Sequence, residues 1–378
     1  MNQSYCIFAA QYFPHLGGVE RYTYHLAKEL TARGDRVVIV TSNVQRLSSY
    51  ECMDGIPVYR FPCLNLLDGR FPVLKPTGDF FKIHRQLKHQ RFDKVIVNTR
   101  FYPHSLYGVL FGKIRGTKTV VIDHGSSHLT VHNPFWDTVG GWYEHLFTKI
   151  LQLFCQDYYG VSQASVRWLK HFHIRAKGTL YNAIDLKEIQ ARLDKPKRDF
   201  CKECQIPNHA SVITFTGRLL REKGLLPLTQ AFSQLQKIYP DTYLCIAGDG
   251  DLEQELRAID DSHMKILGRL DAGEIIDLLR ITDIFCLPSV SEGFSTSLLE
   301  AAACGNYIVV TDTACPYELL PDHTGGTILR ELSASAIADG LCHALEHPKE
   351  RQTAIKNTYQ KLTENFTWDI VTDKVQAL

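Results

Sequence analysis

The stretch that decides the fold is residues 284–312, IFCLPSVSEGFSTSLLEAAACGNYIVVTD. Its first four residues form an apolar run typical of a buried strand, and residues 298–304 have the composition of a helix. A second apolar run at residues 308–310 predicts another strand. Glu292 and Gly293 are therefore expected on the turn between strand and helix, where open α/β sheets bind their ligands.

Two glutamates in this stretch have a spacing that restricts how they can act together. Glu300 lies eight positions after Glu292, so on one continuous helix the two side chains would point about 80° apart. They converge only if Glu292 lies on the loop ahead of the helix. Ser295, Thr296 or Ser297 could then cap the helix, and its free N–H groups would suit a phosphate-bearing ligand.

The composition predicts a soluble globular protein of two domains. The chain has 378 residues, of which 44% are hydrophobic and 22% charged. Its formal net charge of +1 gives no reason to expect nucleic acid as a partner. No run approaches the roughly 20 apolar residues of a membrane span, and the N-terminus lacks the pattern of a signal peptide, so a cytoplasmic location is the default expectation.

The eleven cysteines are scattered along the chain, and most are interpreted as reduced core residues. Cys245, Cys286 and Cys304 lie in apolar segments. Cys201 and Cys204 have the spacing of a metal or redox pair, but no second pair or histidine cluster in the sequence completes a zinc site. We therefore expect no metal site there.

The N-terminal half begins with a strand, a glycine turn and a helix. An apolar run at residues 5–10 is followed by Gly17-Gly18 and by a helical pattern that ends at Gly34. This order is typical of phosphate binding, because a glycine without Cβ lets an anion approach the backbone N–H groups. A plain tight turn is the alternative for the glycine pair. Further strands are expected at residues 36–41, 57–61, 94–98, 118–122 and 158–161, and the helical stretches between them favour a parallel, doubly wound sheet.

His124 directly follows the strand expected at residues 118–122 and Asp123. A residue at that end of a strand faces the crevice of a doubly wound sheet, which makes His124 a candidate functional residue. A structural histidine is the alternative.

Two stretches of this half have a composition that differs from that of ordinary core segments. Residues 75–91 combine basic and apolar side chains over one helix, and aromatic and aliphatic side chains recur near helical spacing in residues 135–159. A solvated basic face and a core stripe are the ordinary interpretations. The alternative hypothesis is a peripheral contact with an anionic membrane, on the inner face of the cytoplasmic membrane.

A polar, charged stretch up to Pro207 separates the first α/β series from a second one. We place the first domain at residues 1–185 and the second at residues 186–365, with a C-terminal helix at about 366–378 that packs back on the first. Arg218 and Lys223 follow the strand expected at residues 211–216. Arginine can grip phosphate oxygens in a fork and lysine can neutralise them, whereas surface salt bridging is the alternative. Further strands are expected at residues 242–247, 263–267 and 283–287.

The motifs together resemble the retaining nucleotide-sugar glycosyltransferases of family 4, and the resemblance covers nearly the whole chain. It rests on Gly17-Gly18-Val19-Glu20, on Gly217-Arg218 with Glu222-Lys223-Gly224, on Ala247-Gly248-Asp249-Gly250, and on the glutamate motif with Cys304-Gly305. It implies the GT-B fold, an α/β fold of two Rossmann-like, doubly wound parallel-sheet domains that face an interdomain cleft. The first domain would lie on the acceptor side, and the second would bind the nucleotide sugar.

The resemblance also implies the roles of individual residues. Arg218 and Lys223 would bind the donor diphosphate, with backbone contacts from Gly17 and Gly18. Glu300 would hold the ribose hydroxyls, and Arg269 would lie beside the base. His124 would lie near the anomeric carbon, and the family implies no metal and no cofactor besides the donor. The sugar would be addressed by Glu292 and the backbone of Gly293, Phe294 and Ser295.

This chain departs from the family pattern at two places. The domain junction often has Pro-Asn-Gly-Val-Asp, whereas this chain has Tyr181-Asn-Ala-Ile-Asp185, which keeps Asn and Asp and lacks Pro and Gly. After Gly305, Asn306 and Tyr307 replace the usual Thr-Pro.

The function that the resemblance implies is transfer of a sugar, with retention, from a nucleoside diphosphate donor of the UDP type. The acceptor would be a glycan or a lipid-linked molecule in the synthesis of cell-surface polysaccharide or glycoconjugate. A sugar-nucleotide epimerase of the same fold and a non-catalytic sugar-nucleotide-binding scaffold are the alternatives. We expect acceptor choice to reside in the loops at residues 101–104 and 126–142.

Overall fold

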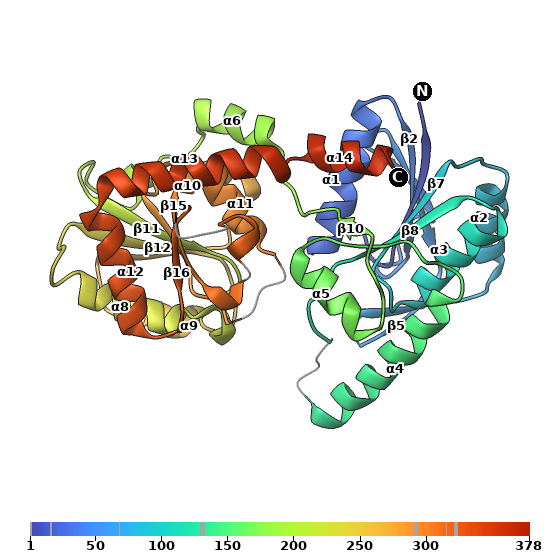
Figure 1. Cartoon of the computed structure of the whole chain (residues 1–378), viewed down its shortest axis with the longest axis horizontal. Coiled ribbons are helices and arrows are strands. Elements are labelled where there is room, and N and C mark those ends of the chain that lie inside the picture. The colour runs from blue at the N-terminus through green and yellow to red at the C-terminus, as the bar shows by residue number, and fades with distance from the viewer. Residues whose placement is uncertain are drawn as a thin grey trace. The chain divides into compact units, whose positions relative to one another are not determined.

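A computed structural model describes residues 2–15, 17–67, 69–128, 133–290, 294–314, 316–320 and 324–378. The predicted site residues Glu292 and Gly293 lie outside the described residues. The chain forms two compact units, Met1–Asn182 with Trp368–Leu378, and Ala183–Thr367 (Figure 1). The sequence prediction placed the division after residue 185 and expected the C-terminal helix to pack on the first domain.

The first unit is built on an eight-stranded sheet with the order β10-β9-β8-β7-β1-β2-β4-β3. All neighbouring strands pair in parallel except β3 and β4. Its strands are β1 (Ser4–Ala9), β2 (Arg36–Ser42), β3 (Tyr50–Met53), β4 (Ile56–Phe61), β7 (Lys94–Asn98), β8 (Lys118–Asp123), β9 (Tyr158–Gly160) and β10 (Gly178–Thr179). Its helices are α1 (Gly18–Ala32), α2 (Gly78–Lys88), α3 (Pro103–Ile114), α4 (Pro134–Gln152), α5 (Gln163–His171) and α14 (Trp368–Gln376).

The central strand and first helix of this unit show why the sequence folds this way. Residues 5–9 of β1 are all buried, as expected of a strand covered on both faces by helices. On α1, Tyr22, Leu26 and Leu30 recur every fourth residue and form its buried stripe. The helix ends at Ala32, and Arg33 and Gly34 follow it; the positive φ of Gly34, 88°, suits a residue without Cβ.

Two hairpins depart from the predicted alternation of strands and helices. Strand β3 pairs antiparallel with β4 through the turn Asp54-Gly55, which has φ values of 50° and 81°. A second hairpin joins β5 (Cys63–Leu66) to β6 (Phe71–Leu74) outside the main sheet. The predicted fold class of a doubly wound parallel sheet is nevertheless confirmed, with one antiparallel edge strand.

The second unit has a six-stranded, all-parallel sheet with the order β13-β12-β11-β14-β15-β16. Its strands are β11 (Ser211–Thr216), β12 (Thr242–Ala247), β13 (Met264–Gly268), β14 (Ile284–Leu287), β15 (Tyr307–Thr311) and β16 (Thr327–Leu329). Its α-helices are α6 (Leu186–Asp194), α7 (Phe200–Glu203), α8 (Leu225–Leu235), α9 (Glu253–Arg257), α10 (Ala272–Arg280), α11 (Thr296–Ala303), α12 (Ala334–Glu346) and α13 (Pro348–Asn365).

Helices cover both faces of this second sheet. Helix α8 packs against α12, whereas α11 packs against α6, α10 and α13. Asn306, one of the departures from the family pattern, is buried and donates from Nδ2 to the carbonyl oxygens of Leu279 (2.9 Å) and Thr282 (2.7 Å). It therefore satisfies carbonyl groups at the C-terminal end of α10. None of the described helices combines the length and the apolar composition needed to cross a membrane.

Candidate active site

The order of strands reverses in the second unit between β11 and β14. From β11 the chain proceeds outward to β12 and β13, and from β14 it proceeds the other way to β15 and β16. A reversal of this kind leaves a crevice at the carboxyl ends of the two central strands, which is the usual ligand site of such sheets. The loop after β11 carries Arg218 and Lys223, and the loop after β14 leads to α11.

These two loops are joined by hydrogen bonds from the backbone and from a hydroxyl. The backbone N–H of Val290 and the hydroxyl of Ser289 donate to the carbonyl oxygen of Glu222, at 2.8 and 3.4 Å. Gly224 lies beside the carbonyl of Pro288, with a φ of 69°. The described parts of the two loops therefore form one connected surface.

Gly224 offers a test of how closely these loops must pack. A Cβ on Gly224 would overlap the Pro288 carbonyl oxygen, whereas a Cβ on Gly305, which has a similar φ of 76°, would come no closer than 4.0 Å to Ile355. The left-handed conformation alone costs alanine about 1–2 kcal/mol. We expect Gly305→Ala to lose about that much stability and Gly224→Ala to lose clearly more, by differential scanning calorimetry. Equal losses would show that the approach of the two loops is not needed.

The three predicted cations of this unit lie on strand-end loops. Arg218 is exposed, and among the described residues no ion pair holds its guanidinium group. Lys223 is half-buried at the end of a 3₁₀ turn, Arg221–Lys223, that precedes α8. Arg269 follows β13 and is exposed, with Nη1 3.7 Å from Asp249 Oδ2. All three positions are thus at the carboxyl edge of the sheet, as the sequence predicted.

The helix that follows β14 begins at Thr296, and Ser295 occupies the position before its first turn. The Ser295 hydroxyl bonds the Ser297 hydroxyl at 2.7 Å and does not cap the helix, so the predicted side-chain cap is wrong at this residue. Phe294 is buried, and its ring lies 5.2 Å from that of Phe366. Glu300 lies in the second turn and is half-buried. Phe294 therefore anchors the loop through its side chain and leaves only its backbone for a ligand.

The first unit has its own reversal of strand order, between β1 and β7. His124 follows β8, the neighbour of β7, and lies at the carboxyl edge where the sequence placed it. Its Nε2 is 2.9 Å from Asn98 Oδ1, and Asn98 Nδ2 donates to Thr23 Oγ1 at 2.8 Å. Thr23 Oγ1 donates in turn to the carbonyl of Val19. A chain of hydrogen bonds thus runs from His124 to the first turn of α1.

The hydrogen bonds that link His124 to Asn98 and Thr23 determine where the His124 ring carries its proton. Because Asn98 uses its amide N–H toward Thr23, its oxygen faces His124, and Nε2 of His124 must donate. Burial lowers the pKa of His124 to about 3, so the ring is neutral near pH 7. The ring also meets Tyr22 edge to face, at 4.9 Å. His124 is therefore a neutral, oriented side chain whose Nδ1 is its acceptor atom.

Gly17 and Gly18 lie at the start of α1, as predicted, but a protein carboxylate already lies there. A Cβ on Gly17 would overlap Glu20 Oε2, and the Glu20 carboxylate accepts hydrogen bonds from the backbone N–H groups of Gly17 and Glu20. His15 Nε2 is 4.0 Å from Glu20 Oε1. Burial nevertheless raises the pKa of Glu20. An incoming phosphate at this turn would therefore have to displace Glu20.

Sequence reasoning missed the residues that support the site. Asn98 is the last residue of β7, and in the sequence it follows the apolar run 95–97; a polar residue at the carboxyl end of an expected strand was the available signal. The segment at residues 101–104, expected to serve the acceptor, includes His104, which is buried and bonds Ser42 and the carbonyl of Val40. Burial lowers the pKa of His104 to about 4. That histidine is part of the core and cannot meet an acceptor.

Comparison with known proteins identifies the family. Residues 16–188 match "Glycosyltransferase Family 4", and residues 197–361 match "Glycosyl transferases group 1". The chain belongs to the family 4 glycosyltransferases. It has the GT-B fold, transfers sugar from a nucleotide-sugar donor and is of the retaining class by family membership. The epimerase and scaffold alternatives are therefore set aside.

Similar proteins cover almost the whole chain. A glycosyltransferase of Methanocaldococcus jannaschii is 24% identical over 96% of this chain and 94% of its own length. The GPI3 subunit of phosphatidylinositol N-acetylglucosaminyltransferase from Saccharomyces cerevisiae is 25% identical over 94% of this chain and 78% of its own length. The crystal structure of Anabaena HepE in complex with UDP has a TM-score of 0.73 at 17% identity, covering 100% of this chain and 99% of HepE, which shows a shared fold.

Proposed function

We propose that this glycosyltransferase moves a hexose-type sugar from a UDP-sugar to a glycan or a lipid-linked acceptor, in the synthesis of cell-surface polysaccharide or glycoconjugate. The observation that carries the proposal is the loop after β11, which holds two cations, Arg218 and Lys223, and which hydrogen bonds to Glu222 join to the loop that leads from β14 to α11. The UDP complex of HepE supports the choice of UDP. The yeast relative, whose name specifies phosphatidylinositol, supports a lipid-linked acceptor.

In this proposal each predicted residue contacts one part of the donor. Arg218 and Lys223 bind the diphosphate, Glu300 holds the ribose hydroxyls and Arg269 lies beside the base. Glu292, with the backbone of residues 293–295, addresses the sugar. In the first unit, His124 Nδ1 accepts a hydrogen bond from a sugar hydroxyl, and the amides at Gly17-Gly18 approach the diphosphate once Glu20 moves aside. The interdomain cleft that would bring these groups together stays a prediction.

The chemistry follows from where charge develops. As the bond between the sugar and the phosphate breaks, the departing UDP gathers negative charge. The two cations and the N-terminal end of α11 therefore stabilise the transition state more strongly than they stabilise the bound donor. The acceptor hydroxyl attacks from the same face and passes its proton to the leaving phosphate. We propose that no metal ion or further cofactor is required, because fixed cations supply the charge. The neutral ring of His124 suits binding of a hydroxyl.

The test is a donor and acceptor screen. The purified protein is incubated with UDP-, GDP- and ADP-sugars in the presence of lipid-linked and glycan acceptors, in EDTA, and the released nucleotide is measured. Release of UDP that depends on an acceptor is the expected result. Turnover only with GDP- or ADP-sugars would refute the choice of UDP, and turnover that requires added Mg²⁺ or Mn²⁺ would refute the metal-free mechanism.

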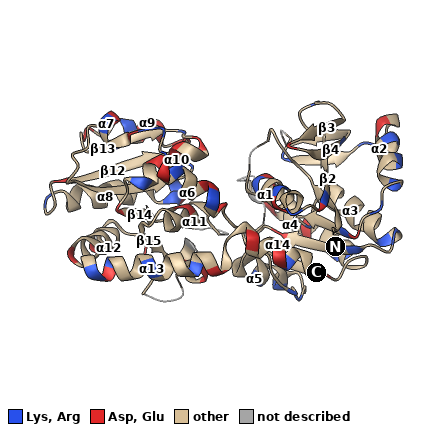
Figure 2. Cartoon of the chain, turned by 90° about the horizontal axis from the view of Figure 1, so that it is seen from above, with Lys and Arg blue, Asp and Glu red and all other residues tan. Residues whose placement is uncertain are grey.

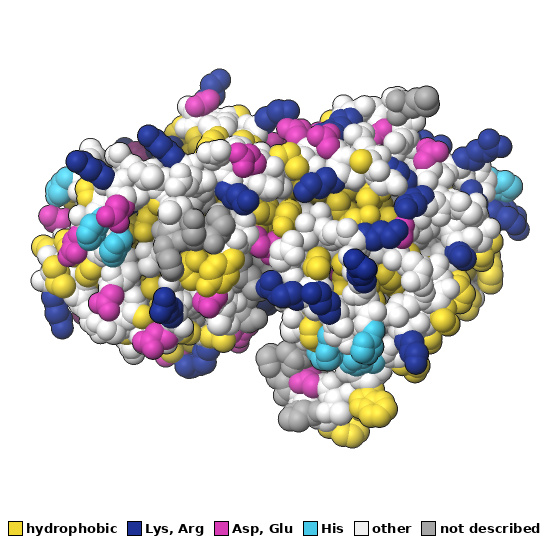
Figure 3. Space-filling view, viewed as in Figure 1, with side chains coloured by type: hydrophobic (Ala, Val, Ile, Leu, Met, Phe, Trp, Pro, Cys, Tyr) yellow, Lys and Arg dark blue, Asp and Glu magenta, His cyan; other side chains and the backbone are white. Residues whose placement is uncertain are grey.

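We further propose that α4 and α2 bring the enzyme to the cytoplasmic face of an anionic membrane. The predicted stripe of α4 divides in the structure, because Leu151 is buried whereas another face of the helix is exposed. That face carries Phe135, Trp136, Val139, Trp142 and Leu146, and Trp142 is 78% exposed. Figure 3 shows hydrophobic side chains gathered at the lower edge of the view, where Figure 1 has α4. An exposed apolar helix face of this kind marks an interaction site.

Helix α2 contributes charge instead of apolar surface. Ile83 and Leu87 of this basic amphipathic helix face the core. Lys82, Arg85 and Lys88 are exposed, and Figure 2 shows the basic segments along α2. The core stripe and the basic face of this helix are therefore both present.

Charge reversal on α2 tests the membrane proposal. Each of Lys82→Glu, Arg85→Glu and Lys88→Glu is expected to weaken flotation with phosphatidylglycerol vesicles by at least about fivefold, since a basic residue near an anionic surface contributes about 1 kcal/mol. Added salt should weaken flotation as well. Lys356→Glu, at an exposed position of the second unit, is the control and should have little effect. Flotation that changes neither with added salt nor with charge reversal would refute a contact through α2.

A further inference from the structure

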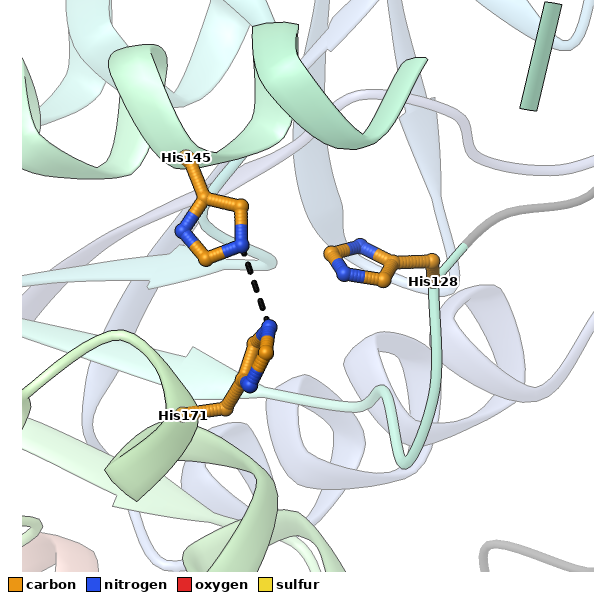
Figure 4. A group of neighbouring side chains, drawn as sticks. All are labelled: His128, His145 and His171. Atoms are coloured by element: carbon orange, nitrogen blue, oxygen red, sulfur yellow. Dashed lines mark hydrogen bonds between the residues drawn. The ribbon is translucent and has the colours of Figure 1, made fainter. Parts of the chain in front are cut away.

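Three histidine side chains from three separate segments of the first unit meet at one point. His128 lies just after β8, His145 on α4 and His171 at the end of α5 (Figure 4). One nitrogen from each ring lies within 4.8 Å of the others. The geometry points to a binding site for one zinc ion, held by these three imidazoles and independent of the sugar donor and acceptor.

The distances between the nitrogens fit a shared ion. His145 Nε2 and His171 Nε2 are 3.0 Å apart (Figure 4). Two nitrogens bound to a tetrahedral zinc ion at 2.0–2.1 Å would be about 3.3 Å apart. A movement of a few tenths of an ångström would therefore convert this hydrogen bond into a pair of metal bonds. Imidazole is also a ligand that zinc accepts readily.

A buried carboxylate orients the third ligand. Glu144 Oε2 bonds His128 Nδ1, while Oε1 of the same carboxylate pairs with the buried Arg100. Glu144 is 4% exposed, so its position is determined by these two partners. A metal-bound histidine usually donates its other ring nitrogen to a carboxylate in this way. The bond to Glu144 leaves Nε2 of His128 for the ion.

Aromatic packing sets the rings, and solvent reaches the site. Trp168 stacks on His171 at 4.7 Å with an angle of 8° between the planes, and meets His128 edge to face at 4.8 Å. Phe172 packs against His145 at 4.7 Å. His145 and His171 are exposed, so a water molecule can reach the fourth position of a tetrahedral ion.

The site would connect α4, α5 and the segment that follows His124. His128 is only four residues after His124, so the ion would restrain the chain directly after a proposed sugar-binding residue. Zinc should therefore stabilise the first unit. The alternative is a packing cluster of histidine and aromatic rings that binds no metal.

Metal titration distinguishes the two. Untagged protein is stripped with EDTA and titrated with Zn²⁺ against a chromogenic chelator, and Co²⁺ is added separately to look for the visible absorption of a tetrahedral ion. We expect one zinc per chain, tetrahedral Co²⁺ bands and a higher midpoint of thermal unfolding with zinc. All four tryptophans lie in the first unit, and Trp168 stacks on a ligand, so tryptophan fluorescence should change on binding.

Three variants complete the experiment. His145→Gln and His171→Gln change exposed side chains and should leave the fold intact, which circular dichroism checks, while lowering zinc affinity by more than about a hundredfold. His173→Asn is the matched control: His173 is exposed and has a φ of 57°, which asparagine tolerates, and it should bind zinc normally. No zinc binding by the unmodified chain, or unchanged binding by the two glutamine variants, would overturn the proposal.

Discussion

Replacing Arg218 with alanine is expected to lower kcat about a hundred- to a thousandfold and to change KM for the donor much less. The reason is that a fixed cation at the diphosphate acts most strongly on the charge that develops as the bond to the sugar breaks. In the bound donor this extra charge has not yet developed. The comparison of kcat with KM, measured by release of UDP at varied donor concentration, therefore reports on the transition state.

The loop supplies its own control for this experiment. Arg221 lies three residues further on, and its guanidinium pairs with Glu255 at 3.0 Å on the surface. Arg221→Ala should keep nearly full activity, because it removes a cation of the same loop that an acidic partner already holds. Arg218→Lys should recover part of the lost rate, since lysine keeps the charge but not the fork. If Arg221→Ala and Arg218→Ala lose activity equally, the proposed role of Arg218 is wrong.

The second unit was the easier one to predict from its sequence. Strands β11 and β12 have the bounds that the apolar runs indicated, 211–216 and 242–247. Each of these strands is short, apolar and followed by a glycine, so pattern and structure agree. The loop contacts, in contrast, depend on the order of strands in the sheet. Gly224 lies beside Pro288 only because β11 and β14 are neighbouring strands.

The first unit shows why the rest was missed. Residues 50–66 were expected to contribute a single strand, yet Asp54-Gly55 is a two-residue turn of the kind that closes β-hairpins, and it was the overlooked signal for β3. The support of His124 by Asn98 and Thr23 joins residues 75 positions apart in the chain, and no local pattern predicts it. The three histidines at 128, 145 and 171 are likewise brought together only by the packing of α4 and α5.

Disrupting a buried ion cluster beside these histidines is expected to have the largest effect on stability. Arg100 is fully buried and pairs with Asp123, at 2.6 Å, and with Glu144. Its partners are also inaccessible, at 0% and 4% exposure. Breaking a buried pair by removing one partner typically costs about 3–5 kcal/mol, because the remaining charge stays buried without compensation. Arg100→Met, which removes the cation from two carboxylates, should reach at least that range at pH 8.

The four tryptophans, all in the first unit, allow this loss to be measured for that unit alone by urea unfolding followed by tryptophan fluorescence. Arg198→Met is the surface comparison, since Arg198 also pairs with two carboxylates, those of Glu203 and Glu274, but is 33% exposed. Circular dichroism follows its unfolding, because it lies in the second unit. It should cost at most about 1 kcal/mol.

The dependence on pH separates lost charge compensation from lost packing. Burial raises the pKa of Asp123 in the folded protein, and the charge of Arg100 opposes that rise, so the pKa should be higher still in Arg100→Met. A carboxyl group with a raised folded-state pKa binds its proton more readily when folded, and stability therefore falls as the pH rises from the unfolded-state value through the folded-state one. Arg100→Met should regain stability relative to the unmodified protein as the pH is lowered from 8 toward 5, and Asp123→Asn added to it should remove part of the loss at pH 8. If Arg100→Met loses the same amount of stability, relative to the unmodified protein, at pH 8 and at pH 5, the guanidinium group matters for its volume and not for its charge.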